Sequence, residues 1–364
     1  MFRTYRQLAL VLAITIISSL AVMPLVSFVR DIRSYSDLES PGIAFTLTPD
    51  HATAAIFFGN RSSAAVARVE GTPAYKDLML RQNTSLATSD RSGDFQSPVS
   101  QLWDLNGGLW GKNKTTEEMD KAAVEPVLRG LKAAVEAYLG NSICFVTVAL
   151  SGHEHNHDYL AHVVAEAVPQ IGLAEAWNGR PRLPALALFS KWLDEGDFGE
   201  PDSLLLVIDN SEYGFDLALI YQEEGLVDTL RHSYHPYTGT ENATDKASLL
   251  QHALGEIIKP PFDYKFYGIQ VPQTIKELVI YGDNIWDPHF RKTLDATLDS
   301  RLIRGAFQRQ PVYAPAIGLA EISFRMLNDA SSLMGKTAPF GCCWKSRGKG
   351  CPQDHGARIY ACPA

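Results

Sequence analysis

The chain has no basic block and no excess of positive charge. Its 364 residues include 33 Lys and Arg against 41 Asp and Glu, which gives a formal net charge of −8 and a pI of about 5.7. Proteins that bind nucleic acids usually carry a basic patch or stripe, so we expect no nucleic-acid partner. No internal repeat of fixed period is visible either. With 46% hydrophobic residues the chain can build a sizeable core, as one large domain or two joined lobes.

Cysteine is scarce before the C-terminal tail. Cys144 lies in an apolar run, and we expect a buried free thiol there. The other four cysteines lie among glycines and prolines in a Cys-rich tail, residues 335–364: Cys342, Cys343, Cys351 and Cys362. Such a stretch cannot build its own apolar core, so we expect disulfides to order it, in any of three pairings. A zinc knuckle that includes His355 is the alternative.

The N-terminus combines arginines with a long uncharged run. Arg3 and Arg6 precede an apolar segment, residues 8–29, which is long enough to cross a bilayer. A cleaved signal peptide is the alternative, because Ser19-Leu20-Ala21 offers a small-residue cleavage site. We favour a signal anchor, since the run continues past that site. The body is then single-pass membrane-bound with a lumenal or extracellular location, or it is secreted.

Four Asn-x-Ser/Thr sequons agree with a glycoprotein of the secretory pathway. They begin at Asn60, Asn83, Asn113 and Asn242.

The best-defined stretch, residues 204–221, reads as a β-hairpin. Five apolar residues end in Asp209, a polar turn that includes Gly214 follows, and apolar residues then alternate from Phe215 onward. An acid that leaves a buried strand in this way can hold a ligand, or it can cap its own turn through Asx-type hydrogen bonds. Both readings of Asp209 stay open.

The remaining pattern indicates α/β layers. Short apolar segments divided by turn residues predict an antiparallel meander over 42–45, 52–58 and 65–69, and residues 83–116 are expected to be exposed and irregular. Further strands are expected at 143–150, 227–234 and 276–281, and helices at 116–139, 157–168, 184–189, 245–258, 289–298 and 314–327.

A histidine-rich turn contains an HExxH motif. On a helix, His153 and His157 would share one face and could bind zinc, with Glu154 as general base. Ser151-Gly152 instead places the motif at a strand-to-helix turn, where a solvated histidine cluster is the competing interpretation. A zinc-dependent hydrolase is the alternative function that this motif predicts.

Four segments, in order, resemble the ATPase domain of the heat shock protein 70 family (DnaK-type chaperones), within the actin-like ATPases. They are Val135-Glu136-Ala137-Tyr138-Leu139-Gly140 with the strand after it, residues 180–187, the hairpin with Asp209 and Phe215-Asp216, and Leu278-Val279-Ile280-Tyr281-Gly282-Asp283. The resemblance implies a two-lobed actin-like (ribonuclease H-like) fold. Its implied nucleotide-cleft residues are Asp209, Gly214 and Gly282.

Departures from the family pattern decide the implied function. Ala44 stands where the family has the acid of its first phosphate loop, and Ser211, Glu212 and Tyr213 replace the glycines of the second. Losing that acid removes an oxygen ligand for Mg²⁺, and side chains in the second loop block the approach of phosphate. Arg180 replaces the family's water-positioning acid, and Gly282 can equally be a plain turn glycine.

The resemblance therefore implies a degenerate, non-catalytic pseudo-ATPase. We expect a cytoplasmic stub and signal anchor at 1–36, lobe I at 40–200, a trimmed lobe II with a closing helix at 201–334, and the Cys-rich tail. Such a protein would act as a binding or scaffold module for an unidentified protein partner. It would need no cofactor, and its binding of ATP would be weak or absent.

Overall fold

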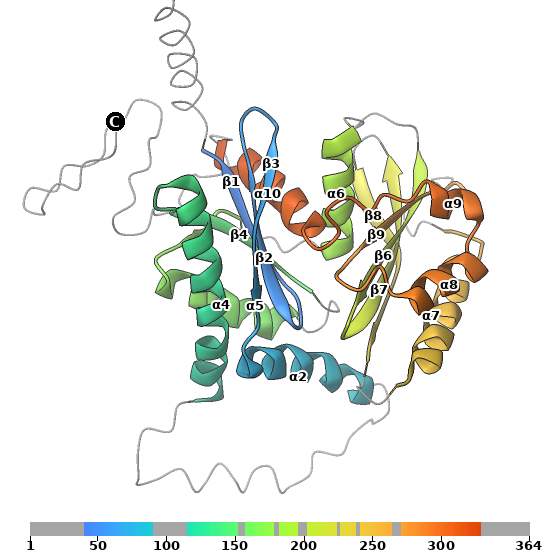
Figure 1. The fold of residues 1–364 in the computed structure, drawn as a ribbon, viewed down its shortest axis with the longest axis horizontal. Helices are drawn as coiled ribbons and strands as arrows, with labels where there is room; N and C mark the ends of the chain where they lie inside the picture. Colours follow the sequence, from blue (N-terminus) through green and yellow to red (C-terminus); the bar gives the residue numbers. More distant parts are fainter. Residues whose placement is uncertain are drawn as a thin grey trace, which may run out of the picture.

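The computed structural model describes residues 40–89, 115–151, 157–177, 182–195, 202–223, 226–237, 241–263 and 271–328. Two mixed β-sheets lie side by side, with helices on their outer faces and between them (Figure 1). The predicted α/β class is confirmed. Within the described residues no helix is both long and apolar enough to span a membrane, and the expected span at residues 8–29 lies outside them.

The first sheet, sheet I, has the strand order β3-β2-β1-β4-β5. Strand β1 pairs antiparallel with β2 and parallel with β4. The parallel neighbours β1 and β4 are not consecutive in the chain, so a crossover connection precedes β4. The strands are β1 (Gly42–Leu47), β2 (His51–Phe57), β3 (Ser63–Glu70), β4 (Phe145–Leu150) and β5 (Ala174–Glu175). Helices α2 (Pro73–Ser89), α4 (Thr116–Leu139) and α5 (His157–Gln170) accompany this sheet.

The second sheet, sheet II, has the order β8-β7-β6-β9. Strand β6 pairs antiparallel with β7 and parallel with β9, which repeats the arrangement around β1. The strands are β6 (Ser203–Ser211), β7 (Gly214–Glu223), β8 (Leu226–Pro236) and β9 (Ile275–Tyr281). Helices α7 (Ala243–Ile257), α8 (Pro288–Thr297) and α9 (Ser300–Arg304) cover its outer face (Figure 1).

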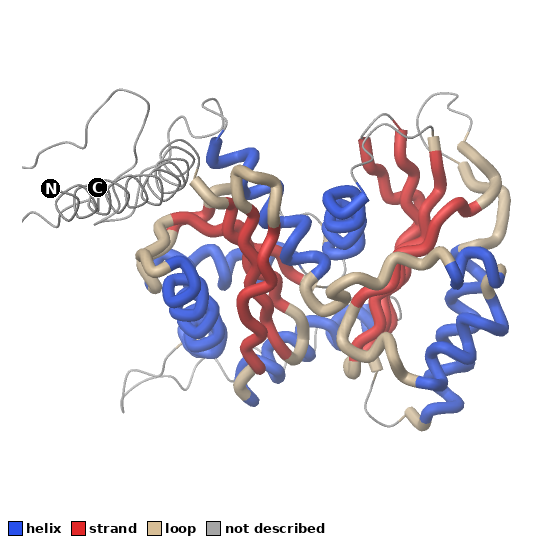
Figure 2. Tube along the Cα trace, turned by 45° about the horizontal axis from the view of Figure 1, so that its top comes forward, coloured by secondary structure: helices blue, strands red, loops and turns tan. Residues whose placement is uncertain are grey.

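Two helices lie between the sheets (Figures 1 and 2). Helix α10 (Ala314–Asn328) packs on β1 and β2 of sheet I, whereas α6 (Leu183–Glu195) packs on β6, β7 and β9 of sheet II. The two helices also contact each other closely. This pair therefore connects the inner faces of both sheets.

Strand alternation assigns side chains to three cores. In β1, Ile43, Phe45 and Leu47 face α4 and α5, while Ala44 faces the core between the sheets. In β6, Leu205 and Val207 enter that central core, and Leu204, Leu206 and Ile208 face α7 and α8. Side chains alternate along a strand with a period of two. Thr46 therefore follows Ala44, and Asp209 follows Val207, on the face between the sheets, just past the apolar residues.

Local sequence signals account for the helix ends. Thr115 and Glu118 form a capping box at the start of α4, and Gly140 ends it in the left-handed region at φ 70°. Asn242 and Asp245 form a capping box at α7.

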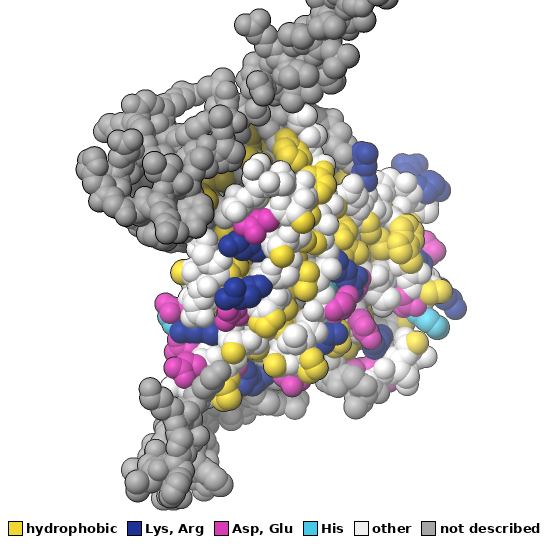
Figure 3. All heavy atoms as spheres, turned by 60° about the vertical axis from the view of Figure 1, so that its left-hand side comes forward, with side chains coloured by type: hydrophobic (Ala, Val, Ile, Leu, Met, Phe, Trp, Pro, Cys, Tyr) yellow, Lys and Arg dark blue, Asp and Glu magenta, His cyan; other side chains and the backbone are white. Residues whose placement is uncertain are grey.

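Along α4, the pair Glu125–Arg129 is one of several i,i+4 ion pairs. Figure 3, which turns the left side of Figure 1 forward, shows acidic and basic side chains interspersed on this face.

Two expectations from the sequence are wrong. Helix α2 extends into the stretch from residue 83 that was expected to be irregular, because its polar residues are compatible with a helix that packs through Tyr75, Leu78 and Met79. Cys144 is disulfide-bonded and not a free thiol. It is only partly buried at the edge of β4, so a second thiol can reach it.

Several predicted features lie outside the described residues. They include the tail cysteines Cys342, Cys343, Cys351 and Cys362, and Asn113. Asn60 is exposed in the turn between β2 and β3, and Asn242 is exposed at the start of α7. Asn83 lies in α2, where only the backbone is described.

The close contact between α6 and α10 makes Gly318 a sensitive position. A Cβ added there would lie 2.1 Å from the Leu186 carbonyl oxygen. We expect Gly318→Ala to lower the free energy of unfolding by about 1–3 kcal/mol, because the two helices must move apart. Urea denaturation of the purified chain would measure this loss.

Gly255 in α7 is the matched control, since an added Cβ there would meet no atom within 4 Å. We expect Gly255→Ala to be neutral or to stabilise by roughly 0.5–1 kcal/mol, because alanine favours helix more than glycine does. Equal losses in both variants would contradict the packing argument.

Candidate functional site

The candidate site lies where the carboxyl ends of strands from both sheets approach each other. Parallel strands end at the same edge of a sheet, so Asp209 at the end of β6 lies beside Tyr281 and Gly282 at the end of β9. On sheet I, the turn after β1 faces this edge. In α/β folds, ligands usually bind in a crevice outside the carboxyl ends of the strands.

A small pocket occupies this junction. Its cavity volume of about 20 Å³ is enough for one water-sized ligand. Both sheets and the start of α10 contribute its lining: Thr46, Thr48, Pro49, His51, Leu183, Asp209, Ser211, Tyr281, Gly282, Asp283, Val312 and Pro315. Asp209 and Gly282, which the sequence predicted to share a cleft, therefore line one pocket.

On the side of sheet I, the β1–β2 turn holds a network of short polar contacts. The Thr46 and Thr53 hydroxyls are 2.6 Å apart across the two strands. The Thr48 hydroxyl lies 3.0 Å from Asp50 Oδ1 and 3.1 Å from His51 Nδ1. Asp50 Oδ1 also lies 2.7 Å from His51 Nδ1. These contacts fix the acid and the imidazole in place, with the Asp50 and His51 side chains only 3% and 4% exposed.

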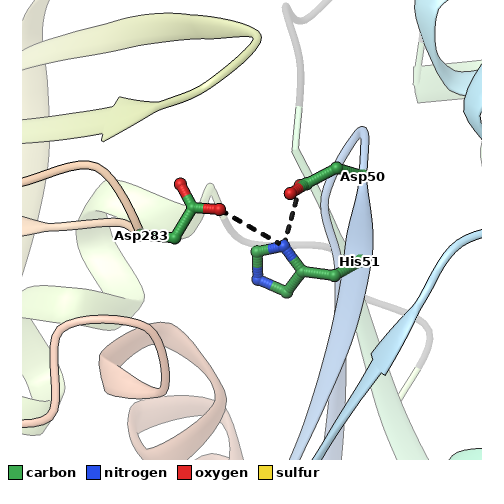
Figure 4. A group of neighbouring side chains, drawn as sticks. All are labelled: Asp50, His51 and Asp283. Carbon is green, nitrogen blue, oxygen red and sulfur yellow. Dashed lines mark hydrogen bonds and ion pairs between the residues drawn. The ribbon is translucent and has the colours of Figure 1, made fainter.

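Asp283, in the loop after β9, meets this network from sheet II. Its Oδ2 lies 3.9 Å from His51 Nδ1 and 3.3 Å from a terminal guanidinium nitrogen of Arg68. The same nitrogen lies 3.6 Å from Asp50 Oδ2, so Arg68 on β3 contacts both acids. In Figure 4 Asp50 and His51 at the start of β2 point toward Asp283 across the space between the two halves. The cluster Asp50, His51, Arg68 and Asp283 therefore joins the sheets electrostatically.

A second group of ionisable residues crosses sheet II. Asp209 pairs in register with Asp216 on β7, and Asp216 pairs with Tyr234 on β8, so the three side chains point to the same face. His232 on β8 lies 2.7 Å from Asp216 through its Nε2. Asp216 thus has a basic partner, whereas Asp209 faces the pocket.

The pKa values of Asp50, Asp209 and Asp283 do not all shift in the same direction. Burial opposes ionisation of Asp50, but the hydrogen bond and charge of His51 and the bond from Thr48 lower its pKa to about 2. Burial and the charges of Asp216, Asp283 and Asp50 hold the pKa of Asp209 well above its usual range. Burial and the charge of Asp50 likewise raise the pKa of Asp283. The raised pKa values of Asp209 and Asp283 show that a further negative charge is unfavourable at this junction, which favours a cation and disfavours a phosphate.

Gly282 has a structural reason to be glycine. Its φ is +109°, and an added Cβ would lie 2.3 Å from the Asn210 carbonyl oxygen and 2.4 Å from Asp209 Oδ1. The loop after β9 is held here by Asn210, whose side-chain amide donates to the Asn284 carbonyl at 2.7 Å. Gly214, also predicted for the cleft, begins β7 and approaches the His235 carbonyl instead of lining the pocket.

The residues at the positions where the resemblance implies phosphate loops have other contacts. Ala44 is fully buried in the apolar core between the sheets, where an acid would be desolvated. Ser211 donates its hydroxyl to the Gly214 carbonyl at 3.0 Å and closes the turn. Tyr213 lies under the Lys76 ammonium of α2 at 5.8 Å, which is a further contact between the two halves. Glu212 is exposed.

The HExxH motif lies largely outside the described residues. Only the backbone of His157 is described, at the start of α5, and His153 and Glu154 are not described. Arg180 also lies outside this part of the chain. Among the described residues, the acid and histidine group that could hold a metal ion is Asp50, His51 and Asp283.

The sequence interpretation did not identify this cluster. Asp50 and His51 fall between two predicted strands, Arg68 falls within the predicted strand 65–69, and Asp283 ends the last segment of the resemblance, so no pattern connects them. Asp50 and Asp283 are 233 positions apart (283 − 50) in the chain. The one local signal for this site is an acid next to a histidine, Asp50-His51, at the start of a strand. This signal is weak because the sequence does not show that Asp283 lies opposite them.

Comparisons with known proteins add no family assignment. A scan against protein-family models finds no match for this chain, and a search of the curated proteins finds none either.

Asp209 should make stability depend on pH. Because its pKa is higher in the folded than in the unfolded chain, ionisation destabilises the fold as pH rises above the unfolded value of about 3.9. Asp209→Asn removes that charge, so we expect a higher melting temperature than wild type at pH 7. The difference should vanish below about pH 4, where the acid is protonated in both states.

Thermal melts across this pH range, in metal-free buffer, would measure the effect. Asp263→Asn is the control, because it changes an exposed carboxylate of the same half of the molecule outside the pocket. A variant that melts lower than wild type at every pH would mean that the Asp209 carboxylate makes a favourable contact.

Proposed function

We propose that this protein is a non-catalytic binding or scaffold module, built as a degenerate actin-like ATPase domain that resembles the heat shock protein 70 family. In this proposal the two-lobed body has lost the means to hold Mg-ATP, and the lobes are held together by their own side chains. The partner would be a protein of the secretory pathway or the cell exterior, in line with the sequons and the N-terminal apolar run.

The repeated strand arrangement supports the actin-like part of the proposal. Each sheet starts with a three-strand antiparallel meander and then adds a parallel strand beside the first one, in the orders β3-β2-β1-β4 and β8-β7-β6-β9. A meander followed by a crossover is the unit expected of a ribonuclease H-like half. Two such units that face each other, with α6 and α10 between them, are consistent with the two lobes of that fold.

The size and charge of the pocket argue against a bound nucleotide. A cavity of about 20 Å³ holds a water-sized ligand. Asp209 and Asp283 line it, and Asp50 lies directly beside His51. A triphosphate would meet these carboxylates at close range, and like charges repel strongly in a partly buried site. Binding would require both a wider cleft and compensating cations.

The contact of Arg68 and His51 with Asp283 is the observation that carries the proposal. Arg68 and His51 both belong to sheet I, and they lie 3.3 and 3.9 Å from the same carboxylate oxygen of Asp283, which follows β9 of sheet II. They occupy the junction where an ATPase of this type would open and close around its nucleotide. We infer a body that keeps one lobe arrangement, as a scaffold requires, without a cycle of nucleotide-driven motion.

Mg-ATP should not stabilise the protein. A ligand present at about 100 times its Kd would add about 2.7 kcal/mol to the free energy of unfolding. We expect millimolar Mg-ATP and Mg-ADP to leave the melting temperature of the full chain unchanged, and calorimetric titration to give no binding heat. A DnaK-type chaperone measured in parallel shows that the assay works. Saturable binding, or phosphate release above the blank, would contradict the proposal.

The ion pair between the sheets should contribute measurably to stability. In a double-mutant cycle of Arg68→Gln and Asp283→Asn, we expect a coupling energy of roughly 0.5–1 kcal/mol, the upper part of the range for partly exposed pairs. The Asp283 side chain is 13% exposed, so added salt should weaken the coupling only slightly.

The Glu125–Arg129 pair of α4 is the matched control. Its Arg129 side chain is 58% exposed, and i,i+4 pairs on helices contribute roughly 0.2–0.5 kcal/mol and are weakened by salt. If the Arg68–Asp283 coupling is no larger than this control and equally sensitive to salt, the pair does not hold the two halves together.

A further inference from the structure

We propose that Asp50, His51 and Asp283 bind a divalent transition-metal ion of the zinc type between the two halves of the molecule. Each residue offers one ligand atom, and these atoms lie within 4.8 Å of one another. Asp50 and His51 come from the β1–β2 turn of sheet I, and Asp283 comes from the loop after β9 of sheet II (Figure 4). The inference does not depend on whether the protein binds a nucleotide.

The distances fit a site that needs only small adjustments to close. His51 Nδ1 lies 2.7 Å from Asp50 Oδ1 and 3.9 Å from Asp283 Oδ2. In a tetrahedral zinc site with bonds of about 2.0–2.1 Å, neighbouring ligand atoms are roughly 3.3 Å apart. The two observed distances lie on either side of that value. Side-chain rotations would bring the three atoms, which lie within 4.8 Å of one another, to bonding distance, with a water as fourth ligand.

The ligand types favour a transition metal over magnesium or calcium. An imidazole nitrogen with two carboxylate oxygens suits zinc and its neighbours, whereas magnesium and calcium prefer all-oxygen sites. The Nδ1 atom that would bind the metal ion now contacts the Thr48 hydroxyl and Asp50 Oδ1. A metal ion would take the place of the proton in the contact between His51 Nδ1 and Asp50.

Two buried polar atoms in the pocket are available to a small polar ligand, and one of them, on Tyr281, lies outside the proposed ligand set. Tyr281 is 3% exposed and lines the pocket, and its hydroxyl has no hydrogen-bond partner within the described part of the chain. Asp283 Oδ1 is buried and likewise accepts no hydrogen bond from the described residues. Buried groups of this kind are normally satisfied by protein, water or an ion. The cavity beside them has room for one water-sized ligand.

Arg68 does not prevent a metal ion from entering. Its terminal nitrogen lies 3.6 Å from Asp50 Oδ2 and 3.3 Å from Asp283 Oδ2. Asp283 Oδ2 is also the oxygen 3.9 Å from His51 Nδ1, so a metal ion would displace the guanidinium from it. Arg68 also holds Glu70 at 2.9 Å through Nε, so it keeps a partner when a cation replaces it beside the two acids. A metal ion would then tie sheet I to sheet II more strongly than the ion pair does alone.

Metal titration of the full-length protein tests the proposal. The protein is stripped with a chelator, and Zn²⁺ binding is measured in competition with a chromogenic chelator. Co²⁺ absorption then reports whether nitrogen and oxygen ligands surround the ion. We expect one tight site in wild type, together with a rise in melting temperature on adding Zn²⁺.

Variants identify the ligands. His51→Gln and Asp283→Asn should weaken Zn²⁺ binding by at least the roughly 10-fold that losing even an outer partner costs. Asp263→Asn, an exposed carboxylate in the same half of the molecule, should bind as wild type does. His153→Ala should also retain the site, because the HExxH motif is a separate cluster in the sequence. Circular dichroism checks that each variant is folded.

Three outcomes would overturn the proposal: folded wild-type protein that binds neither Zn²⁺ nor Co²⁺, an affinity unchanged in both His51→Gln and Asp283→Asn, or a site lost in His153→Ala but kept in His51→Gln. The wild-type measurement holds even where a variant does not fold. Mg-ATP binding in a separate titration would count against the pseudo-ATPase proposal while leaving the zinc result intact.

Discussion

The close packing of α10 against both β1 and α6 is the constraint on which the rest of the structure depends. An added Cβ at Gly42 would lie 2.0 Å from the Ala320 carbonyl oxygen, and one at Gly318 would lie 2.1 Å from that of Leu186. These approaches allow the inner faces of the two sheets to share one apolar core. The shared core brings the carboxyl ends of β1, β6 and β9 together, and the candidate site lies at their junction.

Electrostatics at that junction support both the pseudo-ATPase proposal and the metal-site proposal. Carboxylates from both sheets face a small cavity, and Arg68 is the cation that contacts two of them. Such an arrangement resists a polyphosphate and favours a bound cation. The contacts between oppositely charged side chains also hold the two halves together. The pseudo-ATPase proposal and the metal-site proposal are thus two consequences of the same charge distribution.

Much of the fold could be predicted from local patterns. The hairpin of β6 and β7, the strand β9, and helices α4, α7 and α10 were expected within a few residues of their observed bounds. Their signals are local, namely alternation, helical spacing and caps such as Thr115. Helix α2 was missed because its sequence mixes polar residues with few apolar ones. The disulfide of Cys144 was missed because the residues around a cysteine do not show whether its thiol is paired.

The sequence predicted only the part of the site that sheet II contributes. Asp209 and Gly282 were placed in a common cleft, and both line the pocket. The sequence alone determined the α/β class and the inward direction of Asp209 at the end of its strand, because each follows from the pattern of neighbouring residues. Only the tertiary structure brought Asp50 and His51 to Asp283. Contacts between residues so distant in the chain depend on how two sheets pack, and no local pattern encodes that packing.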